Sequence, residues 1–86
     1  MAELKVSVVS ADREVWSGQA KQIIARTTEG EIGILPGHEP ILAILAEGDV
    51  RVTTTAGDVV TAKADGGFLS VEHDTVTLLA GAAHLV

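Results

Sequence analysis

Apolar and polar side chains alternate along most of this chain with a period of two residues. Leu4, Val6 and Val8 alternate with polar residues, and the same pattern recurs over residues 49–55 and 75–81. Successive side chains of a β-strand point to opposite faces, so this pattern is typical of strands that bury one face. Val and Thr, whose branched side chains favour strands, fill these segments. The chain is therefore predicted to be all-β.

Turn-forming sequences separate the alternating segments at short intervals. Pro36-Gly37, Ala56-Gly57-Asp58 and Asp65-Gly66-Gly67 are typical of turns. Residues 39–46 fit a helical turn after Pro40 as well as a strand. The turns delimit about eight strands, over residues 3–10, 14–28, 31–34, 40–46, 49–55, 58–64, 67–72 and 75–81. Short strands joined by short turns predict a two-layer antiparallel β-sandwich or a flattened barrel.

With 86 residues, the chain is expected to form one domain, residues 1–86. A domain of this size buries only about 60–65% of the surface that its unfolded chain exposes, so nearly all apolar residues must share one core. Aromatic residues are limited to Trp16 and Phe68, so we expect an aliphatic core. Cysteine is absent, and stability must come from packing or from a partner.

The overall charge narrows the classes of partner. A formal net charge of −6 argues against DNA, RNA and anionic membrane surfaces. The longest apolar run, residues 41–46, is far too short to span a bilayer, so we expect no direct lipid insertion. Residues 1–5 lack the apolar stretch of a signal peptide and the Arg-rich character of a transit peptide.

The sequence offers little for catalysis or for metal and nucleotide binding. There is no Cys and no Gly-x-Ser-x-Gly motif, so no catalytic residue is predicted. The histidines are scattered, which argues against a metal site. Gly30, Gly33 and Gly37 precede neither a Lys nor a helix, so no phosphate-binding loop and no cofactor are expected. Lipoyl and biotinyl carrier domains are also small acidic β-sandwiches, but Lys63, the nearest candidate for their modified lysine, lacks the flanking motif.

The acidic residues are unevenly distributed along the chain. No Lys or Arg occurs between Arg26 and Arg51, whereas Glu29, Glu31, Glu39, Glu47 and Asp49 all fall there. Such a segment is either a solvated acidic edge, which discourages pairing between sheet edges, or a docking patch for a basic partner.

The run from Thr28 to Leu42 carries a resemblance to a known family. It contains Gly30-Glu31-Ile32-Gly33-Ile34 and Pro36-Gly37-His38, and it resembles the most distinctive segment of ATP synthase ε subunits. Three further stretches agree in order and spacing. These are Val8–Asp12 with Val15–Gly18, Gly66–Val71, and Val76–Ala80.

The resemblance implies a β-sandwich of about ten strands, close to the number reached from the turns. It also implies two partners, the γ subunit and the c-ring of the rotor. The positions that match the family's c-ring interface are Thr28, Glu29, Gly30, Glu31 and Ile32, and those that match its γ interface are Ser10, His38 and Ala43. The c-subunit loops of the family carry an arginine, which would give Glu29 and Glu31 a cationic partner. On this basis Ala43→Glu is expected to weaken γ binding and to leave the fold intact.

By resemblance, the chain is expected to be a non-catalytic central-stalk subunit that couples c-ring rotation through γ to ATP synthesis in the catalytic head. Full-length ε subunits continue into a C-terminal helical hairpin, and nothing in residues 1–86 matches it. We therefore expect no nucleotide binding by this domain. The lack of a targeting peptide favours a bacterial or plastid-encoded subunit over the mitochondrial homologue. For a bacterial subunit we expect a peripheral position on the cytoplasmic side of the plasma membrane.

Overall fold

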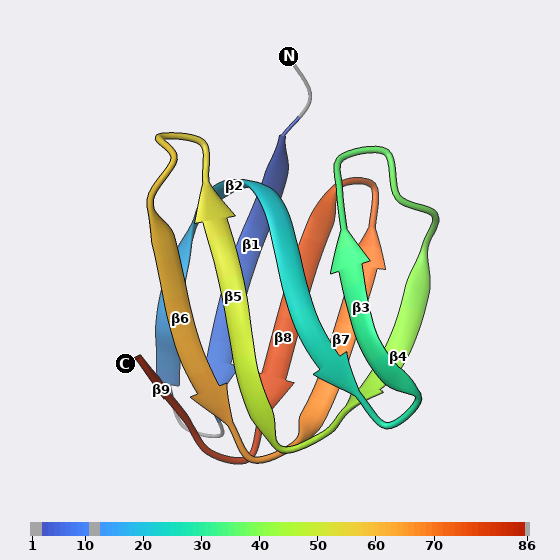
Figure 1. Ribbon diagram of the computed structural model, residues 1–86, viewed down its shortest axis with the longest axis vertical. Helices are drawn as coiled ribbons and strands as arrows, with labels where there is room; N and C mark the ends of the chain where they lie inside the picture. The colour runs from blue at the N-terminus through green and yellow to red at the C-terminus, as the bar shows by residue number, and fades with distance from the viewer. Residues whose placement is uncertain (1–2, 11–12, 86) are drawn as a thin grey trace.

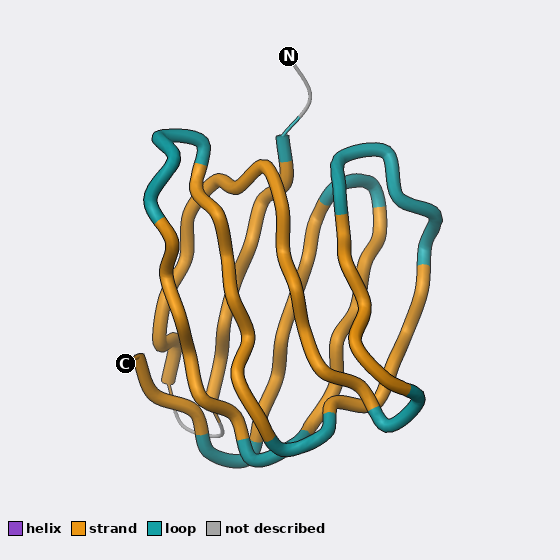
Figure 2. The backbone as a smooth tube through the Cα atoms, viewed as in Figure 1, coloured by secondary structure: helices purple, strands orange, loops and turns teal. Residues whose placement is uncertain are grey.

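The computed structural model describes residues 3–10 and 13–85, and these residues form strands, turns and loops without any helix (Figure 2). Accordingly, none of the described segments is a helix that could cross a membrane. The strands are β1 (Leu4–Ser10), β2 (Arg13–Thr27), β3 (Gly30–Ile34), β4 (Ile41–Leu45), β5 (Gly48–Thr54), β6 (Val59–Ala64), β7 (Gly67–Glu72), β8 (Thr75–Ala80) and β9 (Ala83–Leu85).

The strands form the two layers of a sandwich (Figure 1). The front layer has the order β3-β2-β5-β6-β9, and the back layer has the order β4-β7-β8-β1. Strand β2 belongs to both layers, because its first half pairs with β1 and its second half with β5 and β3. Its 15 residues would extend over about 50 Å at roughly 3.3 Å per residue, whereas the longest dimension of the domain is 32 Å. The strand therefore bends, and its pairing with β5 shifts register between Ala20 and Gln22.

The predicted all-β sandwich is confirmed. The eight predicted strands correspond to β1–β8, and each begins and ends within one residue of the observed strand. Residues 41–45 form strand β4, so the helical alternative for this segment is wrong. Two features were not predicted. Strand β9 has only three residues, which is too short for an alternating pattern to be recognised. Strands β1 and β8 pair in parallel, which departs from the antiparallel prediction; they are distant in sequence, so no hairpin fixes their relative direction.

The core between the layers is aliphatic, as expected. Its largest fully buried side chains are Leu4, Ile23, Ile34, Val52, Leu69, Val71, Val76 and Leu78. Both aromatic residues lie outside this set, since Trp16 packs against the core from a half-buried position and Phe68 is 50% exposed. Loops and turns lie at the two ends of the sandwich, and strands form the faces of both layers (Figure 2).

Candidate interaction surfaces

The β2–β3 turn carries the residues predicted to face the c-ring. Thr28 and Glu29 form the turn, and both are exposed, as are Gly30 and Glu31. The Thr27 hydroxyl braces this turn with two hydrogen bonds. It donates to the Gly30 carbonyl oxygen at 2.7 Å and accepts from the Glu29 amide at 3.2 Å. Gly30 has a φ of 119°, a conformation that favours glycine. The hairpin thus presents a short, braced and acidic tip.

Ile32 differs from its neighbours in the same predicted set. Its side chain is half-buried and packs against the core cluster. The structure therefore brings four of the five predicted c-ring residues to the exposed part of the hairpin, and it places the fifth on the inner side of β3.

Glu31 is already close to positive charge within the domain. Its cross-strand neighbour on β2 is Arg26, and its carboxylate Oε2 lies 3.8 Å from Arg51 Nη2 on β5. The side chains of Glu31 and Arg51 are 59% and 55% exposed, so this is a surface ion pair of modest strength. Asp49 lies opposite Lys63 on β6. At Glu31 and Asp49 the acidic segment thus becomes a surface of mixed charge, because folding brings Arg26, Arg51 and Lys63 beside these two residues.

The three residues predicted to face γ do not form one cluster. Ser10 ends β1, is 6% exposed, and donates its hydroxyl to the Arg13 carbonyl oxygen at 3.3 Å. His38 lies in the β3–β4 loop at the opposite end of the sandwich (Figure 1), with Nδ1 2.7 Å from the Glu39 carbonyl oxygen. These two residues therefore lie at the two ends of the domain.

Ala43 lies on β4 with its side chain toward the core. It is half-buried, packs against the core cluster, and pairs with the fully buried Leu69 on β7. A glutamate here would bring a charge to the edge of the core, so the structure favours a loss of stability over the intact fold that the resemblance led us to expect.

A surface that the sequence did not predict lies on the outer face of the back layer. Leu42 and Ile44 on β4, Phe68 on β7 and Leu79 on β8 are 73%, 56%, 50% and 44% exposed. We call these four residues the apolar face. Ile44 pairs with Phe68, and Phe68 with Leu79, so three of them form a continuous row across three strands. The sequence did contain a signal, since the apolar run 41–46 is too continuous for a strand that buries only one face.

Next to this row runs a second row of uncharged side chains, which begins with Leu42 and continues with hydroxyl side chains. Leu42 pairs with Ser70, Ser70 with Thr77, and Thr77 with Ser7 on β1. The two rows together form an uncharged area across four strands. Contiguous exposed apolar surface of this kind marks an interaction site.

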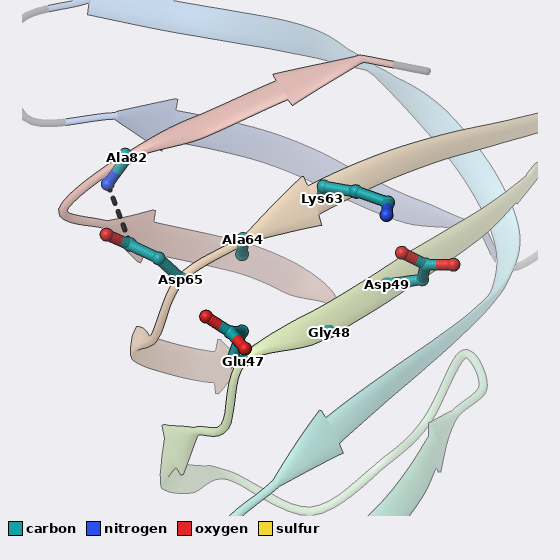
Figure 3. Close-up of a pocket in the computed structure, with 7 residues that line it drawn as sticks. All are labelled: Glu47, Gly48, Asp49, Lys63, Ala64, Asp65 and Ala82. Carbon is teal, nitrogen blue, oxygen red and sulfur yellow. Dashed lines mark hydrogen bonds between the residues drawn. The ribbon is translucent and has the colours of Figure 1, made fainter.

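The front layer has a hollow where β5 begins and β6 ends, and Figure 3 shows the residues that line it. It measures about 380 Å³ and is lined by Glu47, Gly48, Asp49, Lys63, Ala64, Asp65 and Ala82. Asp65 Oδ1 accepts a hydrogen bond from the Ala82 amide at 2.8 Å. Lys63 lies within β6, where it pairs with Asp49 and His84, and not at the tip of a hairpin as a carrier lysine would. No group of three or more metal-ligating side chains occurs among residues 3–10 and 13–85.

Comparison with protein families gives a match over residues 3–86, to the β-sandwich domain of the delta/epsilon chain of ATP synthase. The ATP synthase epsilon chain of Micrococcus luteus is 58% identical over 85 residues, which cover 99% of this chain and 93% of that one. The epsilon chain of Streptomyces coelicolor is 50% identical over 84 residues, which cover 98% of this chain and 68% of that one.

Solved structures agree with these relatives. A chain in the structure of the Euglena gracilis mitochondrial ATP synthase (OSCP/F1/c-ring) superimposes with a TM-score of 0.92 and 28% identity over 99% of this chain. The present chain spans about half of that one, 54%. A chain in the central stalk/c-ring structure of Tetrahymena thermophila mitochondrial ATP synthase has the same fold, with a TM-score of 0.76 and 18% identity over 93% of this chain and 64% of that one. The present chain belongs to the delta/epsilon chain family of ATP synthase subunits, and residues 3–86 are its β-sandwich domain.

Proposed function

We propose that this domain is a non-catalytic part of the central stalk of a proton-translocating ATP synthase. In this role it couples rotation of the c-ring, through the γ subunit, to ATP synthesis in the catalytic head. The family match over residues 3–86 and the 58% identity to a bacterial epsilon chain support this proposal. The domain would then be peripheral to the bacterial plasma membrane, on its cytoplasmic side, and would bind no nucleotide itself.

The apolar face is the observation that carries the proposal, and we assign it to γ. It exposes Leu42, Ile44, Phe68 and Leu79 by 44–73% of their surface, within an uncharged area that crosses four strands. Burying apolar surface stabilises an interface by about 25 cal/mol per Å², and the central residues of an interface contribute most. Of the predicted γ residues, Ser10 ends β1 at one end of the back layer, and His38 lies in the β3–β4 loop at the opposite end. A partner that covered the whole layer would reach both.

The β2–β3 hairpin is assigned to the c-ring. Glu29 is exposed at the braced tip and makes no ion pair among the described residues, whereas Glu31 Oε2 lies 3.8 Å from Arg51 Nη2. Glu29 is therefore the carboxylate that offers the most attraction to a cationic loop, and Glu31 offers less.

The assignment of the apolar face is tested by titrating γ into the domain and measuring the dissociation constant. Phe68→Asp places a charge in the middle of the apolar row and is expected to weaken binding by about 100-fold or more, as for a charge at the centre of an interface. Val59→Asp is the matched control, because Val59 is 60% exposed but lies on β6 in the front layer. Equal affinity of the two variants for γ would overturn the assignment.

A further inference from the structure

The last strand is joined to the rest of the domain by few contacts. Strand β9 has three residues and lies at the edge of the front layer, where it pairs with residues 62–64 of β6 (Figure 1). Among the described residues it pairs with no other strand. Its Ala83 side chain is half-buried against the core, but Leu85 is 45% exposed. The largest fully buried side chains all come from other strands, so the core depends little on β9.

Open space lies on both sides of the segment that leads into β9. The hollow of about 380 Å³ between β5 and β6 includes Ala82 in its lining. A second hollow, of about 300 Å³, lies where β1 ends and β2 begins, and its lining residues are Ser10, Arg13, Gly81, Ala82 and Ala83. Ala82 belongs to both hollows, so residues 81–83 run between them. Segments with few packed neighbours are the parts of a protein that open at the lowest free energy.

A single residue, Asp65, attaches this segment to the sheet with two hydrogen bonds. The Asp65 amide donates to the Ala82 carbonyl oxygen at 3.2 Å, and Asp65 Oδ1 accepts from the Ala82 amide at 2.8 Å (Figure 3). In a regular antiparallel pair a backbone carbonyl would accept the second bond. Here a side chain completes the ladder at the point where β9 begins. Asp65 is exposed, so water can replace this bond when the segment moves.

We infer that residues 81–85 form a strap that opens by itself while the rest of the sandwich stays folded, and that the Asp65 side chain is its latch. Opening breaks the pairs with residues 62–64 and the two bonds between Asp65 and Ala82, and it joins the two hollows. Global unfolding breaks the whole core as well, so the strap opens at a lower free energy. The inference goes beyond the proposed function, because this second conformation belongs to the domain alone and needs no partner.

Native-state amide hydrogen exchange, measured by NMR, tests whether the strap opens. The reference is the amide of Leu69, which lies on β7 between two paired strands. Relative to their rates in an unfolded chain, the amides of Ala82 and β9 are expected to exchange about 10-fold faster or more than that of Leu69. Low concentrations of urea should accelerate Leu69 and leave the strap unchanged, because only global unfolding exposes much surface. Equal protection and equal urea dependence at both places would overturn the inference.

Asp65→Ala tests the latch. This variant is expected to accelerate exchange at Ala82 and in β9 about 5-fold or more, and to leave Leu69 within about 2-fold of its rate in the unmodified protein. Asp58→Ala is the matched control, because it also removes an exposed carboxylate from a turn next to β6 but lies at the other end of that strand. It should not change exchange in the strap. Equal strap rates in the two variants, or an equal acceleration of Leu69 and the strap in Asp65→Ala, would overturn the inference.

A cross-link decides the question if Asp65→Ala does not fold. The chain has no cysteine, and Ala64 and Ala83 are cross-strand neighbours on β6 and β9, at a separation that suits a disulfide. In the double variant Ala64→Cys, Ala83→Cys, oxidation is expected to slow the β9 amides to about the protection of Leu69, whereas the reduced form should keep the fast exchange. An unchanged ratio of the β9 and Leu69 rates on oxidation would contradict the strap. Neither experiment uses γ, so a negative result would leave the proposed function standing.

Discussion

The backbone amide of Gly37 donates a 2.7 Å hydrogen bond to the carboxylate Oδ1 of Asp74, 37 residues away. This bond joins the β3–β4 loop to the β7–β8 turn. The Asp74 carbonyl oxygen also accepts from the Lys5 amide at 2.8 Å, so one residue holds three segments together at this end of the sandwich. His38, a predicted γ residue, follows Gly37 directly, and the position of its loop therefore depends on Asp74.

Asp74→Gly should release the β3–β4 loop without disturbing the turn. Asp74 has a φ of 59°, which glycine adopts readily. The substitution removes the acceptor of a hydrogen bond worth about 1 kcal/mol. Hydrogen exchange at the Gly37 amide is therefore expected to accelerate about 5-fold or more. Asp74→Asn keeps both an acceptor oxygen and tolerance of this backbone region, and it should exchange like the unmodified protein. Identical rates in all three proteins would show that this bond does not hold the loop in solution.

The second prediction compares two glycines that share a positive φ. Gly57, in the β5–β6 turn, has a φ of 95° and nothing within 4 Å of its Cβ position. Gly57→Ala is therefore expected to cost only the backbone strain, about 1 kcal/mol of unfolding free energy. Gly67→Ala adds overlap with the β8 backbone and should cost about 3 kcal/mol or more. Urea denaturation of both variants measures the difference, and equal midpoints would contradict the tight β7–β8 contact.

Adjacent positions on β4 should respond differently to the same charge. Ala43→Glu puts a carboxylate at the edge of the core and is expected to lower the unfolding free energy by about 1–3 kcal/mol. Leu42→Glu, at a side chain 73% exposed, should leave stability within about 0.5 kcal/mol and weaken γ binding instead. Thermal unfolding combined with γ titration distinguishes the two effects. A stable Ala43→Glu protein with reduced γ affinity would restore the expectation drawn from sequence.

The two acidic residues of the β2–β3 hairpin should also differ. Glu29→Gln is expected to reduce ATP-driven proton pumping of a reconstituted enzyme at low ionic strength, and less so at high ionic strength, where attraction is screened. Glu31→Gln should have a smaller effect, because Arg51 Nη2 lies 3.8 Å from the Glu31 carboxylate and offsets part of its charge. Asp58→Asn, in the exposed β5–β6 turn and outside both assigned surfaces, is the control. Pumping that is insensitive to Glu29→Gln at both ionic strengths would identify the hairpin tip as a solvated edge.

The sequence predicted what local patterns determine. Alternation along segments such as Leu4–Ser10 fixed strand positions to within one residue, because one face of each strand is buried against an aliphatic core. The predicted strands over 67–72 and 75–81 left His73 and Asp74 as the turn between them, and both adopt positive φ there without a glycine.

The features that were missed depend on contacts between distant segments. Nothing local to Glu31 indicates that Arg51 comes within 3.8 Å of it, since this depends on both β3 and β5 pairing with β2. The apolar face is also a product of register, because Ile44, Phe68 and Leu79 become neighbours only when β4, β7 and β8 align. The inward orientation of Ala43 could not be predicted, because residues 41–46 are all apolar and only the structure shows the alternation of burial along β4.

Strand β2 gives the domain a particular response to force. Its backbone runs without a break from the back layer to the front, and it forms hydrogen bonds with β1, β3, β4 and β5. Two layers joined only by side-chain packing could slide past each other under shear, whereas these layers share a strand. A push on the β2–β3 hairpin is therefore carried along the backbone of β2 to its first half, and from there by strand pairing to β1 in the opposite layer, so the sandwich is expected to respond as a single stiff body.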